Sequence, residues 1–254
     1  MSLSLGIFWR NRPETMREYA KNLKDLLSTL KGKPFLLNDL TWVGNGTAQE
    51  ARIADDLSNL DNLIFKFAAD PAQVYCDNTG PCDTATWNAT GAFGYLMSFH
   101  NGRSSKQGGI SITVNSGLTD KDQYNFINIK FPRLTGKDCS LEVNNYSFLK
   151  TGFTQLIEGW RPEIGRIMLP SFSDRLTESG FSDIGWLTYI KNSSASAMRN
   201  NPDLIAAGIE MEPVSIGGTL FSIDREMVSP DNEVQVARAR LLRTKLMENH
   251  LIDS

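Results

Sequence analysis

The first thirty residues contain an apolar strand pattern followed at once by an amphipathic helix pattern. Residues 3–9 carry apolar side chains in an alternating arrangement, which predicts a β-strand. Beyond Pro13, apolar residues recur at helical spacing and form one stripe: Met16, Tyr19, Ala20, Leu23, Leu26, Leu27 and Leu30. Pro13 is expected at the first helical position, and Gly32 and Pro34 end the helix. A chain that joins a strand to a helix in this way belongs to neither the all-α nor the all-β class.

Further strand and helix patterns follow along the rest of the chain. Apolar runs predict strands at residues 35–43, 91–99, 110–114, 124–131, 164–169, 185–190, 209–214 and 218–223. Amphipathic spacing predicts helices at residues 47–57, 145–160 and 229–250, and a short helical link at 171–180. Clusters of small and polar residues predict loops at residues 70–90, 101–109 and 191–202.

Local signals define the starts and the buried faces of these helices. Thr47 and Glu50 fit a capping box that opens the first of them. Asn144 or Asn145 is expected to cap the second. The predicted buried residues are Tyr146, Leu149, Phe153, Leu156 and Ile157 in the second helix, and Val234, Ala237, Leu241 and Leu242 in the last.

The order of these elements predicts an α+β fold. Most links between predicted strands are too short for a helical crossover, which favours a largely antiparallel sheet packed with helices. No linker rich in Pro, Gly and Ser separates two cores, so residues 1–254 are expected to form a single domain. Strand–helix–strand patterns occur near both ends, so residues 1–132 and 133–254 could be two related halves.

The sequence contains few residues of the kinds that carry catalysis or bind metal ions. Its two histidines are His100, next to a predicted turn, and His250, close to the C-terminal end. Cys76 and Cys82 are separated by five residues, whereas paired zinc ligands are usually separated by two to four. A His-dependent catalytic triad or a multi-histidine metal site is therefore poorly supported.

Two glutamates and two glycines are further candidates for functional residues. Glu210 and Glu212 lie two apart on a predicted strand and share a face, but the alternation of a half-buried strand explains the same spacing. Gly217 and Gly218 fit a hairpin turn, because the lysine and hydroxyl residue of a phosphate-binding loop are missing. The sequence predicts no catalytic residue, no cofactor site and no metal site.

Acidic residues are concentrated between residues 39 and 83. Eight carboxylates and two basic side chains give this segment a local charge of −6, compared with −3 for the whole chain. The segment could be a merely solvated surface, or it could be a docking face for a basic partner. The residues expected to form such a partner-binding face are Asp55, Asp56, Asp61, Asp77 and Asp83.

The negative charge also bears on the partners and the compartment. Nucleic-acid binders usually carry a basic surplus, so direct nucleic-acid binding is disfavoured. The N-terminal residues do not fit a signal peptide, and no apolar run approaches the length of a membrane helix. Three cysteines form a sparse, odd set that suits a reducing compartment. A cytoplasmic location without membrane contact is therefore expected.

Three short segments are distinctive: the opening strand and turn at residues 6–15, the stretch from Trp42 to Ala51, and the strand at residues 185–189. Together they resemble the Immunity protein 52 family. The resemblance covers roughly residues 5–190. Arg10 and Asn11 stand where the family tends to have Gly-Pro.

The resemblance implies that the chain is an immunity protein that neutralises a cognate toxin of a type VI secretion or polymorphic toxin system. The implied toxin carries a restriction-endonuclease-like nuclease domain. Carboxylates could mimic the phosphates in its groove, or inhibition could equally come from blocking toxin assembly or from distorting the active site. From the residues alone two other classes stay open. One is an enzyme of unrecognised type, and the other is a structural or adaptor protein, with a homo-oligomer possible.

Overall fold

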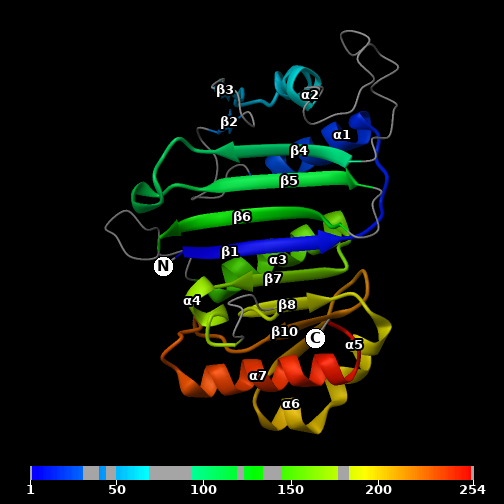
Figure 1. Ribbon diagram of the computed structural model, residues 1–254, viewed down its shortest axis with the longest axis vertical. Coiled ribbons are helices and arrows are strands. Elements are labelled where there is room, and N and C mark those ends of the chain that lie inside the picture. Colours follow the sequence, from blue (N-terminus) through cyan, green and yellow to red (C-terminus); the bar gives the residue numbers. More distant parts are fainter. Residues whose placement is uncertain are drawn as a thin grey trace. The chain divides into compact units, whose positions relative to one another are not determined.

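The computed structural model describes residues 2–30, 40–43, 50–68, 93–118, 123–133, 145–176 and 183–252 (Figure 1). These residues group into two compact units. We call residues 8–132 the N-terminal unit, and residues 1–7 together with 133–254 the C-terminal unit. Each unit combines strands and helices, so the predicted α+β class is confirmed. Within the described ranges, no helix is both long and apolar enough to cross a membrane.

The described strands of the N-terminal unit form an antiparallel arrangement. They are β2 (Thr41–Val43), β3 (Glu50–Arg52), β4 (Phe93–His100), β5 (Ser111–Leu118) and β6 (Asn125–Arg133). Their order is β3-β2-β4-β5-β6, and each neighbouring pair is antiparallel. β5 pairs directly with β6, in a register that places Ile112 opposite Ile129.

Two helices belong to the N-terminal unit, α1 (Met16–Leu30) and α2 (Leu60–Ala68). All seven residues of the predicted apolar stripe of α1 are buried, which confirms that prediction. Pro13 does not begin this helix, because the start is set by a capping box two residues later. Thr15 Oγ1 accepts the Glu18 N–H at 3.2 Å, and Glu18 Oε2 accepts the Thr15 N–H at 2.8 Å.

The predicted helix at residues 47–57 is wrong for the part that the structure describes. Residues 50–52 form β3, and the chain then turns before α2 begins at Leu60. The side chain of Asn59 holds this turn, because its Oδ1 accepts the Ala54 N–H at 2.8 Å and its Nδ2 donates to the Arg52 carbonyl at 2.9 Å. Such side-chain bonds offer the backbone an alternative to a helix. The predicted loop at residues 70–90 lies outside the described residues.

The C-terminal unit has its own set of described strands. They are residues 2–7 of β1 (Ser2–Trp9), with β7 (Ile164–Met168), β8 (Leu187–Ile190), β9 (Glu210–Pro213) and β10 (Thr219–Ser222). Their order is β1-β7-β8-β10-β9, and the neighbours from β7 onward are antiparallel. The predicted hairpin of β9 and β10 is confirmed, with Glu210 opposite Ser222.

A long helix, α3 (Tyr146–Trp160), lies on this sheet, and Asn145 is its cap. The Asn145 carboxamide accepts the Phe148 N–H at 3.1 Å. The predicted inner face is buried except for Tyr146, which is half-buried. Gly165 of β7 allows the close contact with α3, because a Cβ there would lie 2.9 Å from the Phe153 ring. This contact fixes α3 on one face of the strands (Figure 1).

Short helices occupy the segment that we predicted as a polar loop at residues 191–202. The described elements here are α5 (Ser193–Ala197), a 3₁₀ turn (Met198–Asn200) and α6 (Pro202–Ala206), and α4 (Pro170–Ser173) provides the predicted link after β7. The loop prediction is wrong because Asn192 caps α5 through the Ser194 N–H at 2.9 Å. Ala195 and Met198 then bury their side chains.

The last helix, α7 (Glu233–Glu248), forms as predicted but buries a different face. Its buried residues are Gln235, Val236, Ala239, Leu242 and Leu246, whereas Val234 is 61% exposed. Asn232 caps the helix, and the Gln235 side chain accepts the Ser229 N–H at 2.8 Å. This hydrogen bond with Ser229 holds Gln235 on the buried side of α7, where Val234 was predicted to lie. In Figure 1 α7 runs beside α6, to which the Lys245–Asp203 ion pair joins it at 3.0 Å.

Candidate functional site

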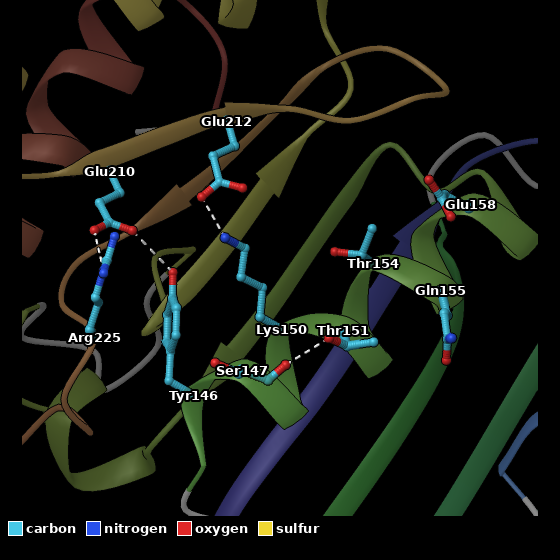
Figure 2. Close-up of a pocket in the computed structure, with 10 residues that line it drawn as sticks. All are labelled: Tyr146, Ser147, Lys150, Thr151, Thr154, Gln155, Glu158, Glu210, Glu212 and Arg225. Carbon is cyan, nitrogen blue, oxygen red and sulfur yellow. Dashed lines mark hydrogen bonds and ion pairs between the residues drawn. The ribbon is translucent and has the colours of Figure 1, made fainter.

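A pocket of about 650 Å³ opens between α3 and β9 in the C-terminal unit (Figure 2). Every residue that lines it has a side chain with a polar group. The lining residues are Tyr146, Ser147, Lys150, Thr151, Thr154, Gln155, Glu158, Glu210, Glu212 and Arg225. A pocket with converging polar groups is the default candidate for a binding site.

Helical and strand periodicity place these side chains. Tyr146, Lys150 and Thr154 lie four residues apart on α3 and therefore project from one face of the helix. Glu210 and Glu212 alternate with Met211 on β9 and point to the same side of the strand. The spacing that we explained by a half-buried strand thus also brings two carboxylates to one pocket.

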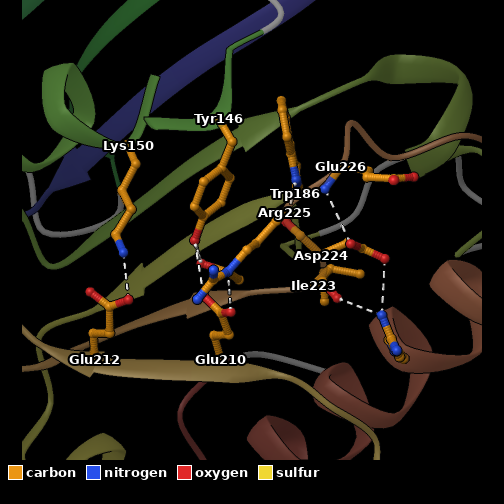
Figure 3. A network of polar contacts seen from close by, with 11 residues as sticks. Tyr146, Lys150, Trp186, Glu210, Glu212, Ile223, Asp224, Arg225 and Glu226 are labelled. Carbon is orange, nitrogen blue, oxygen red and sulfur yellow. Dashed lines mark hydrogen bonds and ion pairs between the residues drawn. The ribbon is translucent and has the colours of Figure 1, made fainter. Parts of the chain in front are cut away.

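One end of the pocket holds a cluster of four hydrogen-bonded polar residues (Figure 3). The Tyr146 hydroxyl donates to Ser222 Oγ at 2.8 Å and lies 3.4 Å from Glu210 Oε2. Arg225 Nε donates to Glu210 Oε1 at 2.6 Å. This hydrogen bond and the charge of Glu210 raise the pKa of Arg225 above its ordinary value. Glu210 therefore holds together a residue of α3 and a residue that follows β10.

Lys150 and Glu212 form a hydrogen-bonded ion pair in the middle of the pocket. The Lys150 ammonium also lies 5.5 Å from the centre of the Tyr146 ring, within reach of a cation–π contact. Partial burial lowers the pKa of Lys150, but the hydrogen bond to Glu212 and the nearby negative charges outweigh it, so the pKa is raised. Lys150 is therefore charged at physiological pH.

Tyr146 is a neutral hydrogen-bonding group in this environment. Burial raises the pKa of its hydroxyl, and the hydrogen bond with Ser222 and the charge of Lys150 offset part of that rise. The Trp186 ring lies 6.0 Å from the Tyr146 ring, centroid to centroid. A phenol with a raised pKa keeps its proton at neutral pH, so Tyr146 is a hydrogen-bond donor there.

Asp224 anchors the segment that presents Arg225 (Figure 3). Its backbone carbonyl accepts the Trp186 indole N–H at 2.8 Å. Its carboxylate accepts Arg238 Nη1 at 2.9 Å, Gln235 Nε2 at 3.3 Å and the Glu226 N–H at 3.1 Å. The position of Arg225 beside the pocket is thus tied to the packing of α7.

The predicted partner-binding aspartates lie in the other unit where the structure describes them. Asp55 and Asp56 form an exposed turn, and Asp61 lies exposed in the first turn of α2. Asp56 Oδ1 accepts the Ser58 N–H at 3.0 Å. The other two, Asp77 and Asp83, lie outside the described residues. We call Asp55, Asp56 and Asp61 the acidic turn; their role in binding stays a prediction.

The histidines and cysteines contribute no metal cluster within the described part of the chain. No group of three or more His, Cys, Asp or Glu side chains there could hold a metal ion. His100 ends β4, and its Nδ1 accepts the Gly102 N–H at 2.9 Å. Cys76 and Cys82 lie outside the described ranges.

Of the ten lining residues, sequence reasoning considered only Glu210 and Glu212 as functional and missed the others, which include Tyr146, Lys150 and Arg225. The i, i+4 spacing of Tyr146 and Lys150 was visible, but we assigned Tyr146 to the buried face. Arg225 carried no local signal, because its meeting with Glu210 depends on the register of β9 against β10. The pocket forms only when the β9–β10 hairpin lies beside α3.

Comparisons with known proteins bear on the fold. No protein-family model matches the chain, and no curated protein matches it. A solved structure of the Pseudomonas aeruginosa T6SS protein PA0821 is similar, with a TM-score of 0.52 and 13% sequence identity. The chain shares its fold with a type VI secretion system protein. The match covers 97% of this chain and 75% of the other. At this identity the likeness extends to the fold alone, and the resemblance to the Immunity protein 52 family stays a prediction.

Proposed function

We propose that the chain is an immunity protein that binds and neutralises a cognate toxin of a type VI secretion or polymorphic toxin system. The fold likeness to a type VI secretion system protein over nearly the whole chain supports this class. The three short sequence segments that resemble the Immunity protein 52 family support it independently.

The acidic turn is the observation that carries the proposal. Its three carboxylates are exposed, and among the described residues neither Asp55 nor Asp61 takes part in an ion pair. Asp55 and Asp61, which have no ion-pair partner among the described residues, are available to a basic surface of another protein. They attract such a surface from a distance and orient it before short-range packing begins.

A nuclease toxin offers the complementary surface. An enzyme that cuts nucleic acid needs a positive groove for the phosphate backbone. Carboxylates placed in that groove would occupy the positions of the phosphates and exclude the substrate. Inhibition of this kind needs no catalytic residue in the immunity protein.

Purified components provide the test. The chain and the toxin encoded by the adjacent gene are mixed, and the complex is followed by size-exclusion chromatography and calorimetry. We expect a stable complex whose association is faster at low salt than at high salt. A neighbouring toxin that neither binds the chain nor loses activity in its presence would contradict the proposal.

The pocket in the C-terminal unit favours a second candidate, an enzyme of unrecognised type. It brings a neutral phenol, an ammonium and two carboxylates together, as acid–base sites do. However, Lys150 and Glu212 are bonded to each other, and Arg225 is bonded to Glu210. A turnover assay separates the two classes, since an enzyme would lose activity with Tyr146→Phe while a toxin-binding protein would still protect its cell.

A further inference from the structure

Two of the four hydroxyl groups that line the pocket donate their protons within the chain, and so does a serine bonded to a lining carboxylate. Tyr146 donates to Ser222, and Thr151 Oγ1 donates to the Ser147 carbonyl at 2.8 Å. Ser215 donates to the Glu158 carboxylate. What these groups still offer to a ligand is oxygen lone pairs, so a ligand that donates hydrogen bonds is favoured over one that accepts them.

The net charge of the pocket also favours a ligand that donates hydrogen bonds, because such a ligand can carry a positive charge. Its lining contains three carboxylates, Glu158, Glu210 and Glu212, and two cations, Lys150 and Arg225, which leaves one negative charge. Each cation is bonded to one of the carboxylates of β9. Glu158 is exposed and, among the described residues, belongs to no ion pair. The uncompensated charge therefore lies at the Glu158 end of the pocket, away from Tyr146 (Figure 2).

We propose that this pocket receives an arginine side chain of the partner protein. The proposal rests on the proposed function, because it adds a second contact region for the same partner. A guanidinium has five N–H donors and no acceptor, which matches a lining of lone pairs with one surplus negative charge. Its charge meets Glu158, and its remaining donors reach the oxygens of Thr151, Thr154 and Gln155 along the same face of α3.

The existing ion pairs do not prevent this binding. Glu212 is 45% exposed, and exposed ion pairs contribute little to stability, so the Lys150–Glu212 pair opens at low cost. A carboxylate ligand would face the opposite situation. It would meet cations that are already bonded to glutamates and a pocket of negative net charge.

Acetyl-arginine-amide is the probe for the pocket itself, and acetyl-citrulline-amide is its neutral control of the same shape. Each is titrated into the isotope-labelled chain, and amide chemical shifts are recorded. The arginine probe is expected to give saturable shifts concentrated on α3 between Lys150 and Glu158, and on β9. Equal shifts with citrulline, or no saturable shift with arginine, would overturn the proposal.

Two charge-neutral variants locate the binding group. Glu158→Gln should weaken binding of the arginine probe by about tenfold, as expected for loss of a charge-assisted hydrogen bond. Glu163→Gln is the matched control, because Glu163 is an exposed carboxylate of the same unit outside the pocket lining. Equal weakening by both variants would show a general effect of charge and would contradict binding of the arginine probe in the pocket.

The complex with the toxin tests whether the arginine comes from the partner protein. Glu158→Gln should raise the dissociation constant for the toxin, and Glu163→Gln should leave it unchanged. If the probe binds but Glu158→Gln leaves the toxin complex unchanged, the pocket is a small-molecule site and the partner-arginine proposal is wrong, while the immunity function stands. If no toxin binds at all, the immunity proposal fails, and the probe titration still reports on the pocket.

Discussion

The acidic turn of the N-terminal unit and the pocket of the C-terminal unit both expose carboxylates, but they use them differently. In the pocket, two of the three carboxylates are paired, Glu210 with Arg225 and Glu212 with Lys150. In the acidic turn, Asp55 and Asp61 form no ion pair within the described residues. Paired carboxylates fix the geometry of their own chain, whereas unpaired exposed carboxylates act mainly through the field that they project into solvent.

The comparison separates residues that matter for folding from residues that matter for binding. Asp224 accepts three hydrogen bonds and joins β10 to α7, so its charge is used internally. Asp61 lies at the N-terminal turn of α2, where a negative charge also stabilises the helix. Asp55 has neither role, which makes it the cleanest residue for testing the electrostatic claim.

The largest expected effect is on association with the toxin. Replacing Asp55, Asp56 and Asp61 together by Lys should lower the association rate constant at low salt by about 10- to 100-fold, because attraction becomes repulsion. Stopped-flow mixing at several salt concentrations measures this association rate constant. Asp55→Lys should account for part of the loss, while Asp231→Lys, a reversal at an exposed position of the C-terminal unit, should change little. Equal effects of the two single reversals would remove the special role of the acidic turn.

The second-largest expected effect is on stability, and it tests whether the acidic turn has a structural role. Asp224→Asn should lower the free energy of unfolding by about 1–3 kcal/mol, because it removes the charge from a hydrogen-bonded network. Asp55→Asn should change it by less than about 0.5 kcal/mol. Urea unfolding measures both. A loss at Asp55 as large as that at Asp224 would mean that the acidic turn is structural.

Glu14 contrasts with the exposed carboxylates of the acidic turn, because it is a buried carboxylate in the same unit. Its Oε2 accepts the Ser116 hydroxyl at 2.6 Å, and Arg12 Nε lies 3.6 Å from Oε1. Burial raises the pKa of Glu14, and the contacts with Ser116 and Arg12 offset part of that rise. Its folded-state pKa therefore lies above the unfolded value of 4.5.

A raised folded-state pKa gives a definite direction to the pH dependence. The stabilising contribution of protonated Glu14 is fully present below pH 4.5 and is lost as the pH rises through the folded pKa. Glu14→Gln cannot lose a proton, so its stability relative to the wild type should increase between pH 4.5 and pH 7.5. Urea unfolding across this range measures the difference. A difference that stays constant, or that changes in the opposite direction, would contradict the assignment.

The smallest expected effect concerns the paired charges of the pocket. A double-mutant cycle with Lys150→Met and Glu212→Gln should give a coupling energy of about 0.2–1 kcal/mol, as for other exposed ion pairs. The cycle is measured by urea unfolding, and raising the salt concentration should reduce the coupling. A coupling well above this range would mean that the pair holds β9 against α3 and does not open readily.

The sequence predicted the elements whose local pattern agrees with their packing. The stripe of α1 was correct at all seven positions, because strong helical periodicity and burial coincide there. The buried face of α7 was wrong, because the Gln235 side chain is held by Ser229 and Asp224 and turns inward. The capping-box pattern at Thr47 was misleading, since residues 50–52 pair with β2 in a way that no local signal indicates.

The candidate sites show the same limit. The acidic turn was visible in the sequence, because contiguous charges need no tertiary structure to be recognised. The pocket could not be predicted, because it joins Lys150 to Glu212 and Tyr146 to Glu210 across more than sixty residues of chain. Contacts between residues this far apart in the sequence depend on strand order and register, which no single residue indicates.

A rescue assay tests the central claim most directly. Cells that express the toxin from the adjacent gene are supplied with the wild-type chain or with the triple Asp-to-Lys variant, at matched levels verified by immunoblot. The account predicts full viability with the wild-type chain and loss of protection with the variant. Cells that die in the presence of the wild-type chain would contradict the immunity function, and cells that survive equally well with both proteins would contradict the role of the acidic turn.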